Sequence, residues 1–472
     1  MTDSQMTTAV RQDVARSLSE ARQRLTVAAR EVFSRGTSFS QDERTQIVRA
    51  AVPVEKVSPL QWLAVQRQDV KTYWSGRETD FAMAGVGVAD TVTSVRHRNL
   101  QGALSYVESA LADAADKVRY YGAVAFDGGR DHFDNDGWRR FEVFRFVLPR
   151  FELVSESGET WLVCNLRLPS DLARQDRILS EIDTLTDQLL DEALVLPSFK
   201  RRIDTPDADG WRSMVQAALR LIESSELQKI VLAKQVTLEL SSDLDPINLL
   251  RNLQSATGPV YCYCFQIEPD VAFLGASPER LYARRGRDIV SEAVGGTRPR
   301  GATANEDAAL ANELLHSPKD LHEHRLVVEG VRQSVHQFCH AVECHPSVAV
   351  MQIESLQHLS TRLRGSLARG VTDADIVETL YPTPAVAGFP RDRALMHIRE
   401  LEPFDRGWYA GPAGWIGRDA AEFAVAIRCG LLDGEKLHVY AGAGIVHGST
   451  AESEYREVED KIAGFTRIFE QR

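Results

Sequence analysis

The sequence predicts an α+β fold, in which helices pack on antiparallel sheets. One observation is a hairpin signal: two strand-like segments, residues 423–432 and 436–441, are joined by Asp433-Gly434, a dipeptide typical of tight turns. A second is a set of amphipathic helices, expected at 307–315, around 321–338 and from Ser453 to the C-terminus. Because hairpins and helices occur without a regular strand–helix alternation, layered antiparallel sheets are favoured over a parallel sheet.

The first 200 residues contain both kinds of element but few clusters of reactive side chains. A polar amphipathic helix is expected within residues 1–36, a strand over 141–154 broken by Pro149, and a helix over 172–193. Asp136-Gly137 predicts a turn. These signals indicate secondary structure without indicating chemistry.

A boundary is expected near residues 201–210, where Pro206 lies among aspartates. It divides the chain into an N-terminal region, 1–205, and a C-terminal region, 206–472. The C-terminal region opens with an amphipathic helix over 211–222, whose apolar residues recur at helical spacing.

A strand is expected directly after that helix, over residues 229–240. Its large aliphatic side chains share one face, and Lys229, Val231 and Ala233 share the other, since successive strand residues point in opposite directions. A lysine on such a face can reach a site beside the sheet.

Composition and charge exclude several classes of protein. The formal net charge is −12, and a protein that binds nucleic acid needs a basic stripe on its surface. The apolar runs are far shorter than the roughly 20 residues that span a membrane. The polar N-terminus does not resemble a signal peptide, so a cytoplasmic protein is expected.

Two pairs of carboxylates are candidate metal ligands. Asp320 and Glu323 lie three residues apart, as do Glu454 and Glu457, and this spacing places each pair on one helix face. If the two faces meet, they offer the oxygen ligands that Mg²⁺ prefers. The alternative is that both are solvated acidic helix faces, which is the commoner case.

Two further residues are candidate acid–base catalysts. Lys229 begins a strand, and a desolvated lysine can act as a base. Glu279 follows the apolar run 271–274, and a carboxyl with a raised pKa at that place could donate a proton. The alternatives are a solvated lysine and an ordinary turn in which Glu279 pairs with Arg280.

A third set of residues could bind anions. Gly295-Gly296-Thr297 and the glycine-rich segment 441–444 offer backbone N–H groups to a carboxylate. Arg428 is expected on a strand face with small neighbours, where its guanidinium could make a bidentate contact. His358 could donate a hydrogen bond to a substrate, although a lone histidine is more often structural.

Taken together, eight segments of this chain resemble the chorismate-utilising enzymes, which include anthranilate, aminodeoxychorismate, salicylate and isochorismate synthases. The resemblance covers about residues 205–472. In chain order the segments are 229–233, 273–280, 292–301, 319–324, 381–390, 401–406, 441–446 and 454–461.

The resemblance implies a four-layer α/β/β/α fold with two large packed antiparallel sheets, to which the N-terminal region contributes strands. It also implies an isochorismate synthase. Family members that use water as nucleophile carry a lysine at the position of Lys229, and those that use ammonia lack it. Salicylate synthases share the lysine but tend to carry a hydroxylated residue where this chain has Ala385. A salicylate synthase, or a chorismate-binding subunit that needs a partner, are the alternatives.

The resemblance further implies roles for the candidate residues. Lys229 would activate water to attack C2 of chorismate, and Glu279 would protonate the departing C4 hydroxyl. Mg²⁺ would be held by Glu323 and Glu457, with Asp320 and Glu454 behind them. Substrate carboxylates and hydroxyls would contact a set of binding residues: Gly296, Thr297, His358, Ala385, Arg428, Gly442 and Lys461.

The remaining expectations concern partners and pathway. The substrate would be chorismate, with no nucleic acid, membrane or obligatory protein partner, and the chain would act as a monomer. Isochorismate supplies menaquinone and catechol-siderophore biosynthesis, and the sequence leaves both open.

Overall fold

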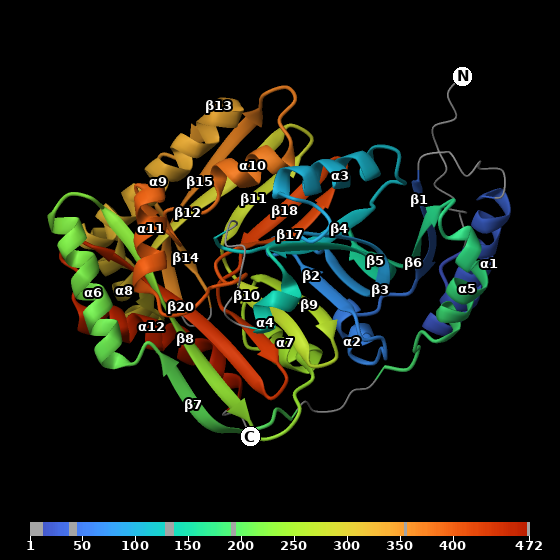
Figure 1. Cartoon of the computed structure of the whole chain (residues 1–472), viewed down its shortest axis with the longest axis horizontal. Helices are drawn as coiled ribbons and strands as arrows, with labels where there is room; N and C mark the ends of the chain where they lie inside the picture. The colour runs from blue at the N-terminus through green and yellow to red at the C-terminus, as the bar shows by residue number, and fades with distance from the viewer. Residues whose placement is uncertain (1–12, 37–44, 128–135, 190–194, 354–355, 470–472) are drawn as a thin grey trace.

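The computed structural model describes residues 13–36, 45–127, 136–189, 195–353 and 356–469. Within these ranges, 20 strands are joined by hydrogen bonds into one continuous sheet. Within this sheet, β5 (Phe144–Glu156) pairs antiparallel with β3 (Ala82–Thr93) on one edge and with β4 (Arg119–Val124) on the other. The sheet therefore has two arms, which share β5 and run through the centre of the molecule (Figure 1).

Both arms are antiparallel and combine strands from the two halves of the sequence. The first arm continues from β3 in the order β2 (Lys71–Ser75), β9 (Tyr261–Glu268), β10 (Val271–Ser277) and β19 (Cys429–Asp433). It then reaches β20 (Lys436–Val446) and β8 (Lys229–Leu240). At this end of the arm, β8 also pairs with β7 (Phe199–Thr205) and β16 (Gly388–Phe389). The second arm continues from β4 in the order β17 (Pro412–Gly417), β18 (Ala420–Val425), β11 (Arg280–Arg285), β12 (Asp288–Pro299) and β15 (Leu356–Leu367). At this end of the arm, β15 also pairs with β13 (Cys339–Cys344) and β14 (Ala349–Gln352). Finally, β1 (Gln46–Val54) and β6 (Glu159–Leu168) extend the sheet beyond β5.

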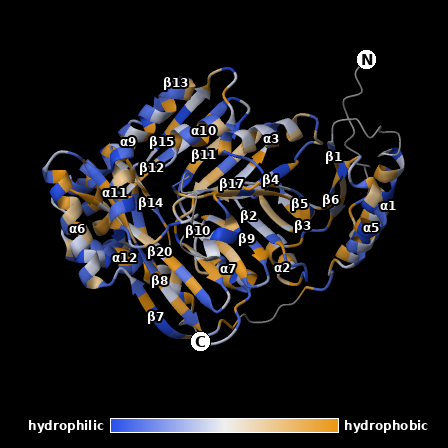
Figure 2. Cartoon of the chain, in the orientation of Figure 1, coloured by the Kyte–Doolittle hydropathy of each residue, from blue (hydrophilic) through white to orange (hydrophobic). Residues whose placement is uncertain are grey.

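The two arms pack against each other around a continuous hydrophobic core. Tyr261 on β9 donates its hydroxyl hydrogen to Glu422 on β18 at 3.2 Å, and Ser277 at the end of β10 donates to the Val425 carbonyl at 2.6 Å. Side chains from both halves of the sequence contribute to this core, and apolar residues dominate the central strands in Figure 2.

Helices cover the outer faces of the arms. The helices are α1 (Leu18–Gly36), α2 (Pro59–Ala64), α3 (Leu100–Ala112), α4 (Asp136–Phe141), α5 (Gln175–Asp183), α6 (Ala208–Glu223), α7 (Pro246–Ser255), α8 (Ala304–His316), α9 (Pro318–Phe338), α10 (Asp373–Leu380), α11 (Arg391–Leu401) and α12 (Ala451–Thr466). Helices α6, α7 and α12 pack on the first arm, α8 and α9 pack on β12 and β15 of the second, and α1 covers β1 and β6. The predicted α+β fold with two large packed antiparallel sheets is confirmed.

Local sequence signals explain the elements that lead to the site. Asp207 caps α6 by accepting a hydrogen bond from the Gly210 N–H, and Trp211 and Met214 on its apolar face are buried. The predicted strand 229–240 is β8. The predicted hairpin is formed by β19 and β20, with Gly434 at φ +60°, a conformation that glycine adopts without steric cost.

Several element predictions differ from the structure in bounds or in type. The strand predicted over 141–154 starts at Phe144, and Pro149 lies inside it, beside a register irregularity in the β3–β5 pairing that accommodates the missing N–H. Asp136-Gly137 begins α4 and is not a turn, because apolar residues that follow pack into the core as a helical turn.

Two further predictions differ in where an element ends or divides. The helix predicted over 172–193 is a short 3₁₀ turn, Leu172–Arg174, followed by α5, which ends at Asp183; residues 190–193 lie outside the described ranges. The strand predicted over 423–432 is divided into β18 and β19 by residues 426–428, where the chain crosses from the second arm to the first.

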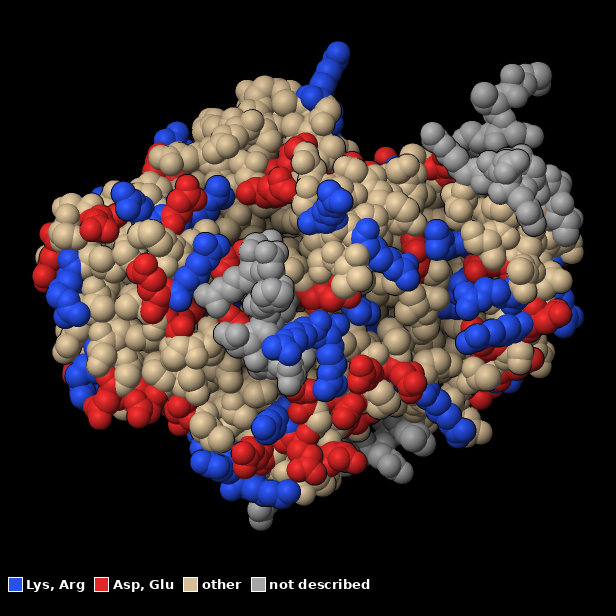
Figure 3. Space-filling model, viewed as in Figure 1, with Lys and Arg blue, Asp and Glu red and all other residues tan. Residues whose placement is uncertain are grey.

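The molecular surface carries mixed charge. Acidic and basic side chains are interspersed over the face shown in Figure 3. In the part of the chain that is described, no helix is long and apolar enough to cross a membrane.

Candidate active site

Lys229 and Glu323 form an ion pair at the centre of the candidate site. Lys229 lies at the start of β8 with 1% of its surface exposed, and its Nζ is 2.9 Å from Oε1 of Glu323 on α9. Both side chains pass over Gly444 of β20: a Cβ there would lie 2.3 Å from Glu323 Oε1 and 2.9 Å from Lys229 Cε. The glycine-rich segment that was predicted to bind an anion thus makes room for two charged side chains.

Each of the other three candidate metal ligands also has a cationic partner. Glu457 and Lys461 pair at 2.7 Å within α12, Asp320 pairs with Arg298 at 2.8 Å, and Glu454 pairs with Lys319 at 2.6 Å. Glu454 is almost fully buried, and burial followed by the nearby Glu457 charge raises its pKa.

The carboxylates of α9 and α12 act on one shared cation, Lys319. Burial lowers the pKa of the Lys319 ammonium, but the charges of Glu454, Glu323 and Glu457 outweigh burial and raise it. Lys319 of α9 is thus close enough to the carboxylates of both helices for their charges to act on it, while each of the four carboxylates is paired with a cation. The described residues contain no group of three or more histidine, cysteine or acidic side chains arranged to hold a metal. Two carboxylates, such as Glu323 and Glu457, fit the requirement of Mg²⁺, which usually keeps several water or substrate ligands.

Glu279 is buried in the turn between β10 and β11, with 4% of its surface exposed. Burial is the largest influence on its carboxyl and raises its pKa to about 8; Lys229 lowers the pKa, Glu292 raises it, and Lys461 and Arg77 lower it. The charge of Lys229 therefore acts on Glu279, and the carboxyl is protonated at neutral pH. This is the state that a general acid requires.

A hydrogen-bonded chain joins the predicted anion-binding residues. Arg428 Nη2 donates to Nε2 of His358 at 3.2 Å, and Nδ1 of His358 lies 3.1 Å from the Thr297 hydroxyl and 3.3 Å from the Gly296 carbonyl. Because a guanidinium only donates, Nε2 is the acceptor and the imidazole carries its proton on Nδ1. Burial, Arg428 and Lys461 lower the His358 pKa well below its usual range, so the ring is neutral.

Gly296 allows the backbone to approach α9. It lies at a register irregularity between β12 and β15 with φ +70°, and a Cβ there would be 3.1 Å from the Asp320 side chain. A residue other than glycine would be strained at this position, which brings Thr297 beside His358.

The prediction that Arg428 lies on a strand face is wrong. It occupies the break between β18 and β19 with φ +51°, a left-handed conformation that is uncommon for residues other than glycine. Burial lowers the Arg428 pKa to about 10. Arg428 and Lys461 both line a cavity of about 590 Å³, and Lys229 and Glu279 are not among its lining residues.

Lys461 connects α12 to β20 by donating to the Gly442 carbonyl at 2.9 Å. The strand predicted over 436–441 is longer in the structure: residues 441–446 continue β20 and pair with β8 up to Val446, opposite Lys229. Ala385 lies in the turn before β16, whose Phe389 also pairs with Lys229. Its methyl group packs against the hydrophobic core.

A buried ion pair that sequence reasoning did not single out fixes the strand of Lys229. Glu402 Oε1 accepts a hydrogen bond from the Ala233 N–H at 2.8 Å, and Arg406 donates to the Val231 carbonyl at 2.9 Å. Glu402 and Arg406 also pair with each other. Both residues lie in the segment 401–406, one of the eight that resemble the family, but the sequence does not place this segment beside β8.

The family model described as chorismate binding enzyme matches residues 31–470. The chain belongs to this family. Among curated chorismate binding relatives, isochorismate synthase 2 of Arabidopsis thaliana is 31% identical, with 96% of this chain and 85% of the relative covered. Isochorismate synthase MenF of Bacillus subtilis is 29% identical, with 87% and 90% covered.

A solved structure of the family is similar over nearly its whole length. The menaquinone-specific isochorismate synthase MenF of Escherichia coli superposes with a TM-score of 0.81 at 27% identity, with 94% of this chain and 99% of that chain covered. Anthranilate synthase component I of Streptococcus pneumoniae superposes with a TM-score of 0.66 at 22% identity, which indicates a shared fold.

Proposed function

We propose that this chain is an isochorismate synthase, which converts chorismate to isochorismate. The observation that carries the proposal is the buried Lys229 beside the acidic residues of α9, together with Glu279, a carboxyl that stays protonated at neutral pH and on which the charge of Lys229 acts. The relatives named as isochorismate synthases support the same reaction.

Two residues perform the proton transfers. In its neutral amine form, Lys229 Nζ accepts a proton from a water molecule as the water oxygen forms a bond to C2 of the ring. Glu279 donates its proton to the C4 hydroxyl, whose bond to C4 breaks and which departs as water. The proton on Lys229 then returns to Glu279 through solvent, so that atoms and charge balance over the reaction. Each general acid or base typically contributes about 10²–10⁴-fold to the rate.

The anion-binding residues hold the substrate between the two catalysts. Gly296 and Thr297 bind the ring carboxylate, with His358 oriented by Arg428 beside them. Arg428, Lys461 and the backbone at Gly442 bind the enolpyruvyl carboxylate, since Arg428 and Lys461 line one cavity and Lys461 contacts Gly442. Ala385 contributes no hydroxyl to the site, which favours release of isochorismate over pyruvate elimination.

Glu323 and Glu457 hold Mg²⁺ in this proposal, with Asp320 and Glu454 behind them. When bound, Mg²⁺ supplies positive charge that neutralises the ring carboxylate. To hold the cation, Glu323 would give up its contact with Lys229, and Glu457 would give up its contact with Lys461.

The proposal extends to the setting of the enzyme. The chain acts on chorismate in the cytoplasm as a monomer without an obligatory partner. Its N-terminal region, 1–205, completes the same body as the catalytic region, 206–472, because strands from both regions pair in each arm of the sheet. Its product supplies menaquinone or catechol-siderophore biosynthesis.

Product analysis tests the proposal. Purified protein is incubated with chorismate and Mg²⁺, and the products are separated by chromatography. Isochorismate is the expected product. Salicylate with pyruvate would indicate a salicylate synthase, and Mg²⁺-dependent binding of chorismate without turnover would indicate a subunit that needs a partner. Lys436→Ala, at an exposed lysine at the start of β20, is the control for Lys229→Ala.

A further inference from the structure

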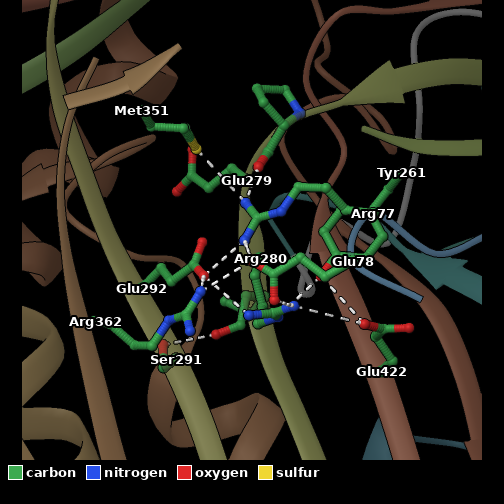
Figure 4. Close-up of polar contacts among 12 residues, drawn as sticks. Arg77, Glu78, Tyr261, Glu279, Arg280, Ser291, Glu292, Met351, Arg362 and Glu422 are labelled. Carbon is green, nitrogen blue, oxygen red and sulfur yellow. Dashed lines mark hydrogen bonds and ion pairs between the residues drawn. The ribbon is translucent and has the colours of Figure 1, made fainter. Parts of the chain in front are cut away.

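A cluster of charged side chains surrounds the turn that carries Glu279 (Figure 4). Its members are Arg77, Glu78, Arg280, Glu292, Arg362 and Glu422. We refer to them as the arginine–glutamate cluster. They come from both regions of the chain, since Arg77 and Glu78 belong to the connection between β2 and β3.

Arg77 is the member that reaches the backbone of the Glu279 turn. Its Nη1 donates to the carbonyl of Pro278, the residue immediately before Glu279, and its Nη2 donates to Glu292 Oε1 at 2.7 Å. The guanidinium also lies over the ring of Tyr261, 5.5 Å from its centroid. With 7% of its side chain exposed, Arg77 is fixed from three sides in a desolvated position.

Other contacts fix the turn on either side of Pro278. Ser277 Oγ donates to the Val425 carbonyl at 2.6 Å, and the Val425 N–H donates to the Glu279 carbonyl at 3.0 Å. Pro278 has no N–H, so its carbonyl is its single polar backbone group. The hydrogen bond from Arg77 therefore restrains Pro278, the residue of the turn that has no backbone N–H to donate.

Glu292 in turn holds Arg77. Its Oε1 also accepts from Arg280 Nη1 at 2.9 Å and lies 3.5 Å from Arg362 Nη2. Since Arg280 directly follows Glu279, the same carboxylate restrains the chain on both sides of the proposed acid.

We propose that Arg77 is a positioning residue for Glu279, which fixes the direction of its carboxyl by holding the Pro278 carbonyl against Glu292. The N-terminal region thereby contributes to the chemistry without touching the substrate. This inference rests on the proposed role of Glu279 as general acid. A displacement of about 1 Å in a catalytic group can cost on the order of 10²-fold in rate.

A purely electrostatic role for Arg77 predicts a different result. Burial dominates the Glu279 pKa, Lys229, Lys461 and Arg77 lower it, and Glu292 raises it. If Arg77 acted chiefly through its charge, its removal would raise the Glu279 pKa and extend activity to higher pH. A positioning role instead predicts a lower kcat at every pH, including the plateau below the pKa.

The test compares Arg77→Ala, Arg77→Lys and Arg362→Ala in the full-length chain. Arg362 is the matched control because it contacts Glu78 and Glu292 but does not bond to Pro278. We expect Arg77→Ala to lower kcat about 10- to 100-fold across the pH profile with KM changed less than about threefold. Methylguanidine in the assay should restore part of kcat, and Arg77→Lys should lie between Arg77→Ala and wild type. Arg362→Ala should keep wild-type kcat.

Three outcomes would overturn the inference. The first is a folded Arg77→Ala variant with wild-type kcat. The second is a loss of kcat in Arg362→Ala as large as that in Arg77→Ala. The third is an Arg77→Ala variant in which only the pH of the alkaline limb changes. If Arg77→Ala does not fold, the Arg77→Lys variant provides the test, because one ammonium cannot reproduce both hydrogen bonds of the guanidinium. A wild-type kcat in Arg77→Lys would contradict the positioning role. Failure of the wild-type enzyme to form isochorismate would instead refute the proposed function, so the two claims fail separately.

Discussion

Lys229 Nζ lies 2.9 Å from Glu323 Oε1, so the proposed general base is bonded to a proposed Mg²⁺ ligand. The pair is held over Gly444, on the strand that neighbours β8. Base and metal site are therefore one structural unit, and a change in either side chain alters the surroundings of the other.

The Lys229→Ala variant should lose most of its activity while keeping its affinity for chorismate. Removal of a general base typically costs about 10²–10⁴-fold in kcat. The carboxylate-binding residues Arg428 and Lys461 remain, so the substrate Kd, measured by fluorescence titration, should change little. Residual activity near the wild-type value would show that another group activates the water.

The Glu279→Gln variant tests the proton donor and its pKa. A general acid works while it is protonated, so wild-type kcat should be constant at neutral pH and fall as pH rises through about 8. Glutamine cannot donate the acidic proton, so kcat should drop about 10²–10⁴-fold and the alkaline limb should vanish. The pH dependence of kcat from about pH 6 to 10 provides the measurement.

The same carboxyl has a consequence for stability. Burial raises the Glu279 pKa from 4.5 in an unfolded chain to about 8, so the folded protein binds the proton more tightly. This contribution to stability is fully present below the unfolded pKa and is lost as pH rises through the folded pKa. The Tm of wild type should therefore fall relative to Glu279→Gln between about pH 4.5 and 8 and level off above that, as followed by circular dichroism. Parallel Tm curves would contradict a protonated Glu279.

Secondary structure near the site was predictable because its signals are local. Asp433-Gly434 predicted the hairpin of β19 and β20, and the apolar spacing of residues 211–222 predicted α6. The break at Arg428 was not predictable, since the left-handed backbone there depends on a change between the two arms of the sheet. Pro149 was misread for the same reason, because its tolerance depends on the partner strand.

The candidate residues could be selected from the sequence, but their contacts could not. Nothing local indicates that Glu323 pairs with Lys229, or that Arg77 bonds to Pro278 across 201 positions. Such pairs depend on which strands become neighbours. The sequence also assigned Gly444 to anion binding, whereas its lack of a side chain makes room for Glu323 and Lys229.

The Gly444→Ala variant should therefore inactivate the enzyme by steric means. A Cβ would lie 2.3 Å from Glu323 Oε1 and 2.9 Å from Lys229 Cε, both below normal contact distance. The two side chains must shift, and we expect kcat to fall at least about tenfold. Steady-state kinetics and Tm provide the measurement. A variant with unchanged kcat would show that the pair moves freely.

Glu323 should contribute to Mg²⁺ binding as well as to activity. In Glu323→Gln, one carboxylate of the proposed site is replaced by a neutral amide, so the Mg²⁺ affinity measured by isothermal titration calorimetry should fall about tenfold or more. Glu329→Gln is the control on the same helix, since Glu329 pairs with Arg332 at the surface. Equal affinities in the two variants would argue against Glu323 as a ligand. Chelation should remove activity from wild type, and added Mg²⁺ should restore it.

The buried pair of Glu402 and Arg406 should be required for a stable β8. Their side chains are 2% and 3% exposed, and Arg406 also donates to the carbonyls of Val231 and Val386. The Arg406→Met variant leaves the Glu402 charge and both carbonyls without this partner, and breaking a buried pair typically costs about 3–5 kcal/mol. The double variant Glu402→Gln/Arg406→Met removes the uncompensated charge, so it should be more stable than Arg406→Met alone. Urea unfolding of the three proteins tests this order, and a double variant that is less stable than Arg406→Met would contradict it.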